Sequence, residues 1–234
     1  MITEHPIFAW LTGFEAKRKR QLAIAPKGAI SDFLSVPLPM NNTPIEQLNI
    51  LSVDFETTGL HAIKDKLLSV GFVEINHQQI QLKTSYHQII NTKKDLDADN
   101  VIIHQITDQQ KALGAPLKEV VESLLQALAG KIMLVHFARI EKQFLQRACL
   151  ELYGFAPSFP MIDTLMIAKR QFDKHDIAYD PSKLRLSALR HKYGLPEHHA
   201  HNALNDAIAT AELLMAQVNH MPLANKVQLK DILL

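Results

Sequence analysis

Two carboxylates follow an apolar stretch near residue 50. The segment Leu51-Ser-Val-Asp54-Phe-Glu56-Thr-Thr-Gly59 alternates apolar and polar residues, as a half-buried strand does. Alternate side chains of a strand share a face, so Asp54 and Glu56 point the same way. Two such anions repel unless a cation lies between them, and carboxylate oxygens are ligands that Mg²⁺ and Mn²⁺ prefer. The pattern therefore indicates a divalent-metal site, although a strand edge with solvated acids would use the same residues.

A second acidic position lies in the first turn of a predicted C-terminal helix. Apolar residues recur at spacings of three and four from Ala203 to Leu214, and Asn202 suits the N-cap. His201 and Asp206 would be about 140° apart on one continuous helix, so they converge only if His201 lies on the entering loop. That arrangement suits a metal ligand beside a proton acceptor. Without such a partner, Asp206 would complement the helix dipole and His201 would be a solvated histidine.

A third acid lies on the apolar face of another predicted helix. Glu141 shares this face with Phe144, Leu145 and Ala148, at spacings of three and four. A buried unpaired carboxylate is costly, so Glu141 either reaches solvent or meets a cation. That cation could be the one that Asp54 and Glu56 require.

In order and approximate spacing, these segments resemble the three motifs of the DEDDh-type 3'-to-5' exonucleases. Within that family the chain is most similar to the epsilon proofreading subunit of bacterial DNA polymerase III and its stand-alone relatives. The resemblance runs from about Ile50 to Val218, and Asp163-Thr-Leu and Leu186-Ser-Ala-Leu also fit. One position departs, because Glu141 stands where the family has aspartate.

The resemblance implies an α/β fold: a ribonuclease H-like mixed sheet flanked by helices. It also implies two divalent cations, Mg²⁺ or Mn²⁺, which promote hydrolysis at the 3' end of DNA and release nucleoside monophosphates. His201 would be the general base. The metal ligands would be Asp54, Glu56, Glu141 and Asp206, and the substrate-binding residues would be Thr57, Thr58, Gly59, Leu60 and His136.

Three other functions use overlapping residues. An RNA-trimming 3'-to-5' exoribonuclease would share every acid and differ in its contacts to the 2'-hydroxyl. A catalytically weakened nucleic-acid-binding or interaction module is suggested by the replacement at Glu141. A zinc hydrolase could use Glu197-His198-His199-x-His201, although adjacent histidines usually diverge.

The composition is typical of an intracellular enzyme. The 234 residues are 47% hydrophobic, enough for a full core, and the formal net charge is only +1. Contacts with single-stranded or frayed 3' ends of DNA, or with RNA, must therefore come from local basic residues and metal ions. Cys149 is the single cysteine, and neither a signal peptide nor a long apolar run is evident. We expect a cytoplasmic protein without membrane contact that could associate with a DNA polymerase.

The sequence suggests three parts. Residues 1–48 form an N-terminal helical and extended appendage with a Pro-containing connector, residues 49–220 an exonuclease domain, and residues 221–234 a C-terminal tail. The basic run Lys17-Arg-Lys-Arg20 is expected on a solvated helix face. Hydrophobic periodicity predicts strands at 49–56, 67–75, 78–90 and 131–136, and helices near 97–106, 116–129, 138–153, 163–172, 184–193 and 202–218.

Overall fold

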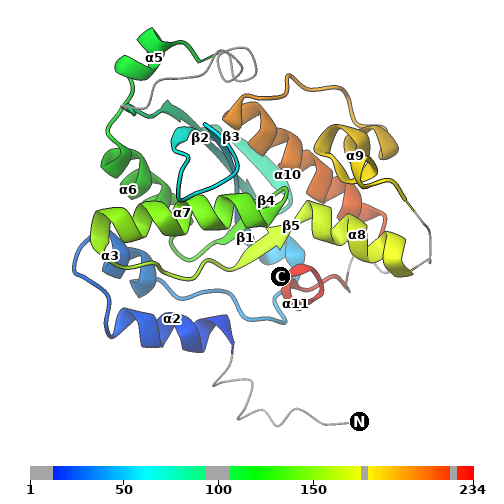
Figure 1. The fold of residues 1–234 in the computed structure, drawn as a ribbon. Coiled ribbons are helices and arrows are strands. Elements are labelled where there is room, and N and C mark those ends of the chain that lie inside the picture. The colour runs from blue at the N-terminus through cyan, green and yellow to red at the C-terminus, as the bar shows by residue number, and fades with distance from the viewer. Residues whose placement is uncertain (1–12, 93–105, 175–178, 222–225) are drawn as a thin grey trace.

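A single mixed sheet organises the described part of the chain (Figure 1). The computed structural model describes residues 13–92, 106–174, 179–221 and 226–234. The strand order is β3-β2-β1-β4-β5, with β1 antiparallel to β2 and parallel to β4. This confirms the predicted α/β class with a mixed sheet. The strands are β1 (Asn49–Thr57), β2 (Leu67–Asn76), β3 (Gln79–Ile89), β4 (Ile132–Val135) and β5 (Met161–Asp163).

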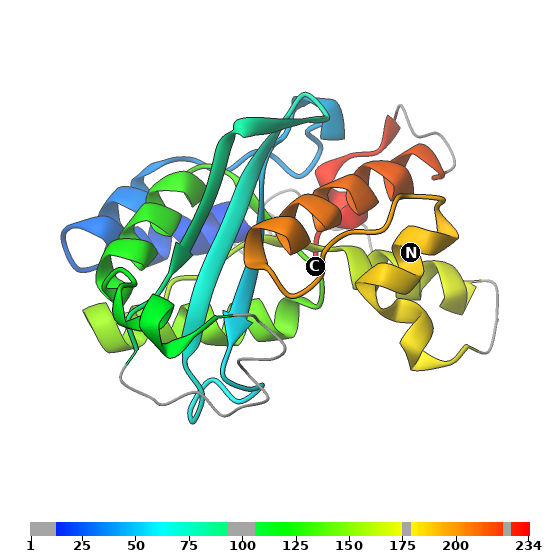
Figure 2. The ribbon, with the colours of Figure 1, turned by 90° about the horizontal axis from the view of Figure 1, so that it is seen from above.

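Helices cover both faces of the sheet. Figure 2 shows α3, α6 and α7 on one side and α8, α9 and α10 on the other. The α-helices are α2 (Phe14–Leu22), α3 (Ala29–Ser35), α5 (Asp108–Ala112), α6 (Leu117–Leu128), α7 (Ala138–Tyr153), α8 (Thr164–Lys174), α9 (Leu186–Lys192), α10 (Ala203–Asn219) and α11 (Leu229–Ile232), and the 3-10 turns are η1 (Ile45–Gln47) and η2 (Pro181–Leu184).

The two faces of β1 have different partners. Leu51, Val53 and Phe55 are buried in the core cluster that also contains residues of α3, α6 and α7. On the opposite face, the Ser52 hydroxyl donates a hydrogen bond of 2.6 Å to the carbonyl of Ala207 in α10. Since side chains alternate along a strand, β1 presents its acidic residues to α10.

The segment before β1 is more ordered than its proline content indicates. We expected an extended connector there, but it contains α3, whose Ile30, Phe33 and Leu34 are buried. The basic run on α2 is also not wholly solvated. Arg18 is buried, donates to the Leu34 carbonyl, and pairs with Glu15 at 2.6 Å. Packing of α3 against α6 and α2 has outweighed the local proline signal.

Other elements differ from the prediction mainly in length. The short elements that were missed include β5, which has three residues, α11, which has four, and α5, which has five. A short strand or helix carries too few residues to show periodicity. The helix predicted near 97–106 falls almost entirely outside the described residues.

The C-terminal segment packs against the sheet. Leu229 and Ile232 are buried, and Leu233 forms an isolated bridge with Ile162 of β5. Across the helices of the described residues, none has both the length and the apolar character that a membrane span requires.

Gly71 of β2 allows α10 to approach the sheet. A Cβ atom at this position would lie 2.2 Å from the backbone carbon of Ala203 and 2.2 Å from the nitrogen of Leu204. Asp54 is the neighbour of Gly71 on β1. The missing side chain thus lets the first turn of α10 lie directly over the acidic part of β1.

We predict that Gly71→Ala destabilises the protein by about 1–3 kcal/mol, because the added methyl group forces α10 away from β2. Urea unfolding measures this change, and Ser85→Ala on exposed β3 is the matched control, expected within about 0.5 kcal/mol of the wild type. Equal stability of the Gly71 and Ser85 variants would show that α10 does not need this close approach.

Candidate active site

Three carboxylates from distant parts of the sequence converge at the seam between β1 and α10. Asp54 and Glu56 come from the end of β1, and Asp206 comes from the first turn of α10. One oxygen from each lies within 4.8 Å of the others. The pairing predicted from strand alternation and from the helix boundary at Asn202 therefore produces one acidic cluster.

Glu141 lies at the edge of this cluster, on the first turn of α7. Its face of the helix is buried together with Phe144, Leu145 and Ala148, as the spacing predicted. Burial and the charge of Glu141 both raise the pKa of Asp54, so Glu141 is close enough to act on the cluster, although it is not one of the three acids within 4.8 Å. Within the described residues, Glu141 Oε2 is buried without a hydrogen-bond partner.

Asp163, at the end of β5, fixes the start of α7. Its buried carboxylate accepts backbone hydrogen bonds of 3.0 Å from Phe137 and 2.9 Å from Ala138. It also accepts one of 2.9 Å from Leu165. These N–H groups would otherwise lack partners at a helix start, so Asp163 sets the position from which Glu141 projects.

Burial and mutual repulsion raise the pKa values of Asp54, Glu141 and Asp206. Removal from water raises the pKa of Asp54 well above its usual range, and the charges of Glu141, Glu56 and Asp206 raise it further. Burial raises the pKa of Glu141 to about 8, with its own backbone hydrogen bond opposing and Asp163 adding to the shift. Burial also raises the pKa of Asp206, against the hydrogen bond from the His201 backbone and the nearby His198 ring. Bringing these acids together is therefore costly without a cation.

The donor set fits a hard divalent cation. The cluster offers carboxylate oxygens from Asp54, Glu56 and Asp206, and the partnerless oxygen of Glu141 is near Asp54. Oxygen-only sets favour Mg²⁺ and Mn²⁺ over zinc. Within the described chain, no three-residue metal cluster includes His198, His199 or His201. The zinc alternative therefore lacks its ligand set.

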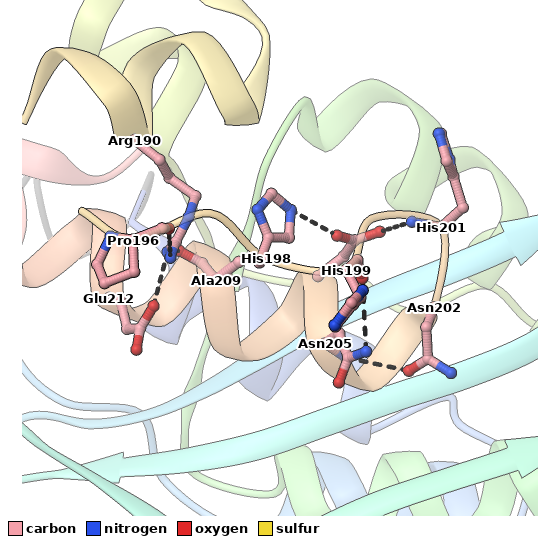
Figure 3. Close-up of polar contacts among 10 residues, drawn as sticks. Arg190, Pro196, His198, His199, His201, Asn202, Asn205, Ala209 and Glu212 are labelled. Carbon is pink, nitrogen blue, oxygen red and sulfur yellow. Dashed lines mark hydrogen bonds and ion pairs between the residues drawn. The ribbon is translucent and has the colours of Figure 1, made fainter. Parts of the chain in front are cut away.

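The loop that enters α10 makes two contacts with Asp206 (Figure 3). His198 Nε2 lies 2.9 Å from Asp206 Oδ1, and the His201 backbone N–H donates to Oδ2 at 2.8 Å. His201 has a φ of 66°, an uncommon value for a residue other than glycine. Figure 3 shows the exposed His201 ring projecting away from α10, while the His198 ring points toward its first turn.

The predicted substrate residues Thr57, Thr58, Gly59 and Leu60 lie at the end of β1 and in the loop after it. The Thr57 hydroxyl donates to the Gly59 carbonyl at 2.7 Å, and Thr58 accepts the Lys66 N–H at 3.0 Å. A Cβ atom on Gly59 would lie 2.4 Å from an oxygen of the Asp65 carboxylate, so a larger residue there would require the Asp65 side chain to move. Leu60 is 67% exposed and is available to contact a ligand.

His136 and Phe137 join β4 to α7. His136 Nδ1 lies 2.8 Å from the Thr164 hydroxyl, and burial lowers the pKa of His136 against the opposing effect of Asp163. Phe137 has a φ of 77° and is 43% exposed. A bulky residue in this conformation is strained, and its N–H is held by Asp163.

Sequence reasoning did not assign roles to Asp163, His198 or Arg190. Asp163 is the last residue of a strand of only three residues, although an acid before Thr-Leu is a cue for a helix start. His198 is one of three closely spaced histidines, and the pattern does not show which one contacts Asp206. In the sequence Arg190 looks like one of several basic residues at the end of a helix, yet in the structure it is buried.

Comparison with known proteins agrees with this geometry. A family model described as Exonuclease (RNase_T) matches residues 51–214. The PolC-type DNA polymerase III of Thermotoga petrophila is 28% identical over 193 residues, which are 82% of this chain and 13% of that protein. DNA polymerase III subunit epsilon of Treponema pallidum is 28% identical over 176 residues, 75% of this chain and 79% of that protein. The chain thus spans only a small part of the PolC-type relative.

A solved structure shares the fold. The nuclease domain of 3'hExo, a DEDDh family member bound to rAMP, superposes with a TM-score of 0.63 at 16% identity. The match covers 76% of this chain and 94% of that structure. The chain therefore belongs to the exonuclease family and has the ribonuclease H-like fold of DEDDh nucleases.

Proposed function

We propose that this chain is a metal-dependent 3'-to-5' exonuclease that removes nucleoside monophosphates from single-stranded or frayed 3' ends of DNA. The observation that carries this proposal is the convergence of Asp54, Glu56 and Asp206 within 4.8 Å in a chain of the exonuclease family. The buried, partnerless oxygen of Glu141 adds a fourth donor beside them.

The acids would hold two divalent cations, Mg²⁺ or Mn²⁺. Such ions supply Lewis-acid stabilisation of phosphate charge and a bound water of lowered pKa. Asp54 is central among the acids, since the charges of the other three act on it, and it suits a bridging position. Glu56 and Asp206 would complete one site. Glu141 would support the other, and its extra methylene lengthens its reach relative to the aspartate usual in the family.

His201 is the residue we assign as general base. It lies on the loop beside Asp206, and its ring is exposed, so it can receive a proton from the attacking water and pass it to solvent. Histidine is the side chain that most often acts as a general base in enzymes. The ring of His198 is not assigned this role, because its Nε2 already faces the Asp206 carboxylate at 2.9 Å.

The loop after β1 would bind the terminal nucleotide. Thr57, Thr58 and Gly59 present backbone groups there, and exposed Leu60 would pack against the base. His136, held by Thr164, would contact the substrate from the β4 end. With a net charge of only +1, the chain depends on these local contacts and on its cations for nucleic-acid binding.

DNA is favoured over RNA because the similar relatives carry the names of DNA polymerase III components. RNA trimming is the second candidate, since the structural neighbour 3'hExo was solved with rAMP. Those relatives' names also motivate a proposed association with a DNA polymerase in the cytoplasm. We further propose residues 49–220 as the exonuclease domain, with residues 1–48 as an extension and 221–234 as a tail.

The full chain with Mn²⁺ or Mg²⁺ should shorten 5'-labelled single-stranded DNA and mispaired duplex one nucleotide at a time from the 3' end. RNA of the same sequence should be degraded more slowly. Chelation or Asp206→Ala should reduce product to background, because both remove the cation site. Activity that survives in excess chelator would refute metal dependence, and faster RNA degradation would select the second candidate.

We predict that His201→Ala lowers kcat by ~10²-fold or more, because the water loses its proton acceptor. Mn²⁺ affinity should stay near the wild-type value, since the Asp206 contact is made by the His201 backbone and not by its ring. Single-turnover kinetics and Mn²⁺ titration separate the two effects. A parallel loss of metal affinity would make His201 a ligand instead.

Glu141→Gln should stabilise the metal-free protein at alkaline pH. The pKa of Glu141 is raised from 4.5 to about 8 by burial, so only the unfolded chain releases this proton between those values. The wild type therefore loses stability as pH rises from 4.5 to about 8, whereas Gln does not titrate.

The gain should be absent near pH 4.5 and reach at least ~1 kcal/mol at pH 8. Urea unfolding of metal-free protein across this range measures it, and Glu141→Asp, which keeps an acid at this position, is the control. Identical curves for the wild type and the Gln variant would show that Glu141 is solvated.

A further inference from the structure

Both oxygens of Asp206 are contacted by the connector between α9 and α10, residues 193–202. Asp206 Oδ1 lies 2.9 Å from His198 Nε2, and Oδ2 accepts the His201 backbone N–H at 2.8 Å. The side chains of His198 and Asp206 are only 13% and 14% exposed. The contact is thus largely shielded from water, where an exposed pair would contribute little.

Asp206 needs such support because its acidic neighbours repel it. The charge of Glu56 acts unfavourably on it, and burial removes the water that would otherwise solvate it. A carboxylate in this position would turn toward solvent if nothing held it. The imidazole of His198, whose Nε2 lies 2.9 Å from Oδ1, is the polar side chain that approaches this carboxylate from the connector.

The connector is itself fixed to α10 by buried Arg190. One guanidinium nitrogen donates to the Ala209 carbonyl at 2.8 Å and pairs with Glu212 at 2.7 Å. A second nitrogen donates to the Pro196 carbonyl at 2.8 Å, as Figure 3 shows. Because Pro196 is two residues before His198, Arg190 fixes the chain that carries the histidine to the helix that carries Asp206.

The rings of the neighbouring histidines, His199 and His201, do not contact Asp206 in this way. His199 is exposed. Its backbone carbonyl accepts a hydrogen bond of 3.4 Å from the side-chain amide of Asn205. The His201 ring projects away from α10 in Figure 3. Of these three histidines, only His198 has its ring on the Asp206 carboxylate.

We propose that His198 is a positioning residue whose ring, with Nε2 2.9 Å from Oδ1, holds the Asp206 carboxylate beside Asp54 and Glu56, ready to bind a divalent cation. This role depends on the metal-dependent activity proposed above. His198 is not a ligand, since it acts on the cation only through Asp206. Hydrogen-bond donors that orient ligating carboxylates typically change metal affinity about 10–100-fold when they are removed.

The test is a Mn²⁺ titration of the full chain, with free Mn²⁺ measured by electron paramagnetic resonance. His198→Ala should raise the Kd about 10–100-fold. His198→Gln, whose amide nitrogen has a similar reach, should restore most of the affinity. His199→Ala is the matched control and should bind as the wild type does. At saturating Mn²⁺ the kcat of His198→Ala should recover, unlike that of His201→Ala.

Wild-type Mn²⁺ affinity in His198→Ala would overturn the role of His198 while leaving the proposed function intact. Failure of His198→Gln to restore affinity would overturn it too, because the amide supplies the same donor. A wild type that neither binds Mn²⁺ nor shortens DNA would overturn the proposed function and this role together.

Discussion

Repulsion among buried carboxylates is the constraint on which the rest of this structure depends. Burial raises the pKa of Asp54 most, and the charges of Glu141, Glu56 and Asp206 raise it further. The sheet and helices must hold these groups together against that repulsion until a cation offsets it. The surrounding elements therefore do more than fill a core, because their spacing sets how close the acids lie.

Three arrangements fix the elements that carry Asp54, Glu141 and Asp206. The antiparallel pairing of β1 with β2 places Asp54 opposite Gly71, and the absence of a side chain there admits α10. Asp163 accepts the first N–H groups of α7 and so sets the helix that carries Glu141. Arg190 joins α9, the connector and α10 around Asp206.

His198 and His201, on the same connector, have different proposed roles. His198 has its ring on Asp206, whereas His201 contacts Asp206 through its backbone. A ring engaged with a carboxylate suits orientation of a ligand, and a ring facing solvent suits proton exchange. The two histidines are only three residues apart, so the path of the connector decides which ring contacts Asp206.

Local pattern in the sequence determined the faces of the main elements. Alternation placed Asp54 and Glu56 on one side of β1, helical spacing placed Glu141 on the buried side of α7, and Asn202 fixed the start of α10. The predicted roles of the loop residues remain proposals, since no ligand contact tests them.

Tertiary structure decided what local pattern cannot encode. The order of strands brings β5 beside β4, so Asp163 reaches a helix start 25 residues earlier in the chain. Three nearby histidines look alike in sequence, and only the path fixed by Arg190 selects His198 for Asp206. Helix α3 forms within a proline-containing segment because packing against α6 and α2 buries Ile30, Phe33 and Leu34. Periodicity reports which face of an element is apolar, but partners distant in sequence are chosen by packing.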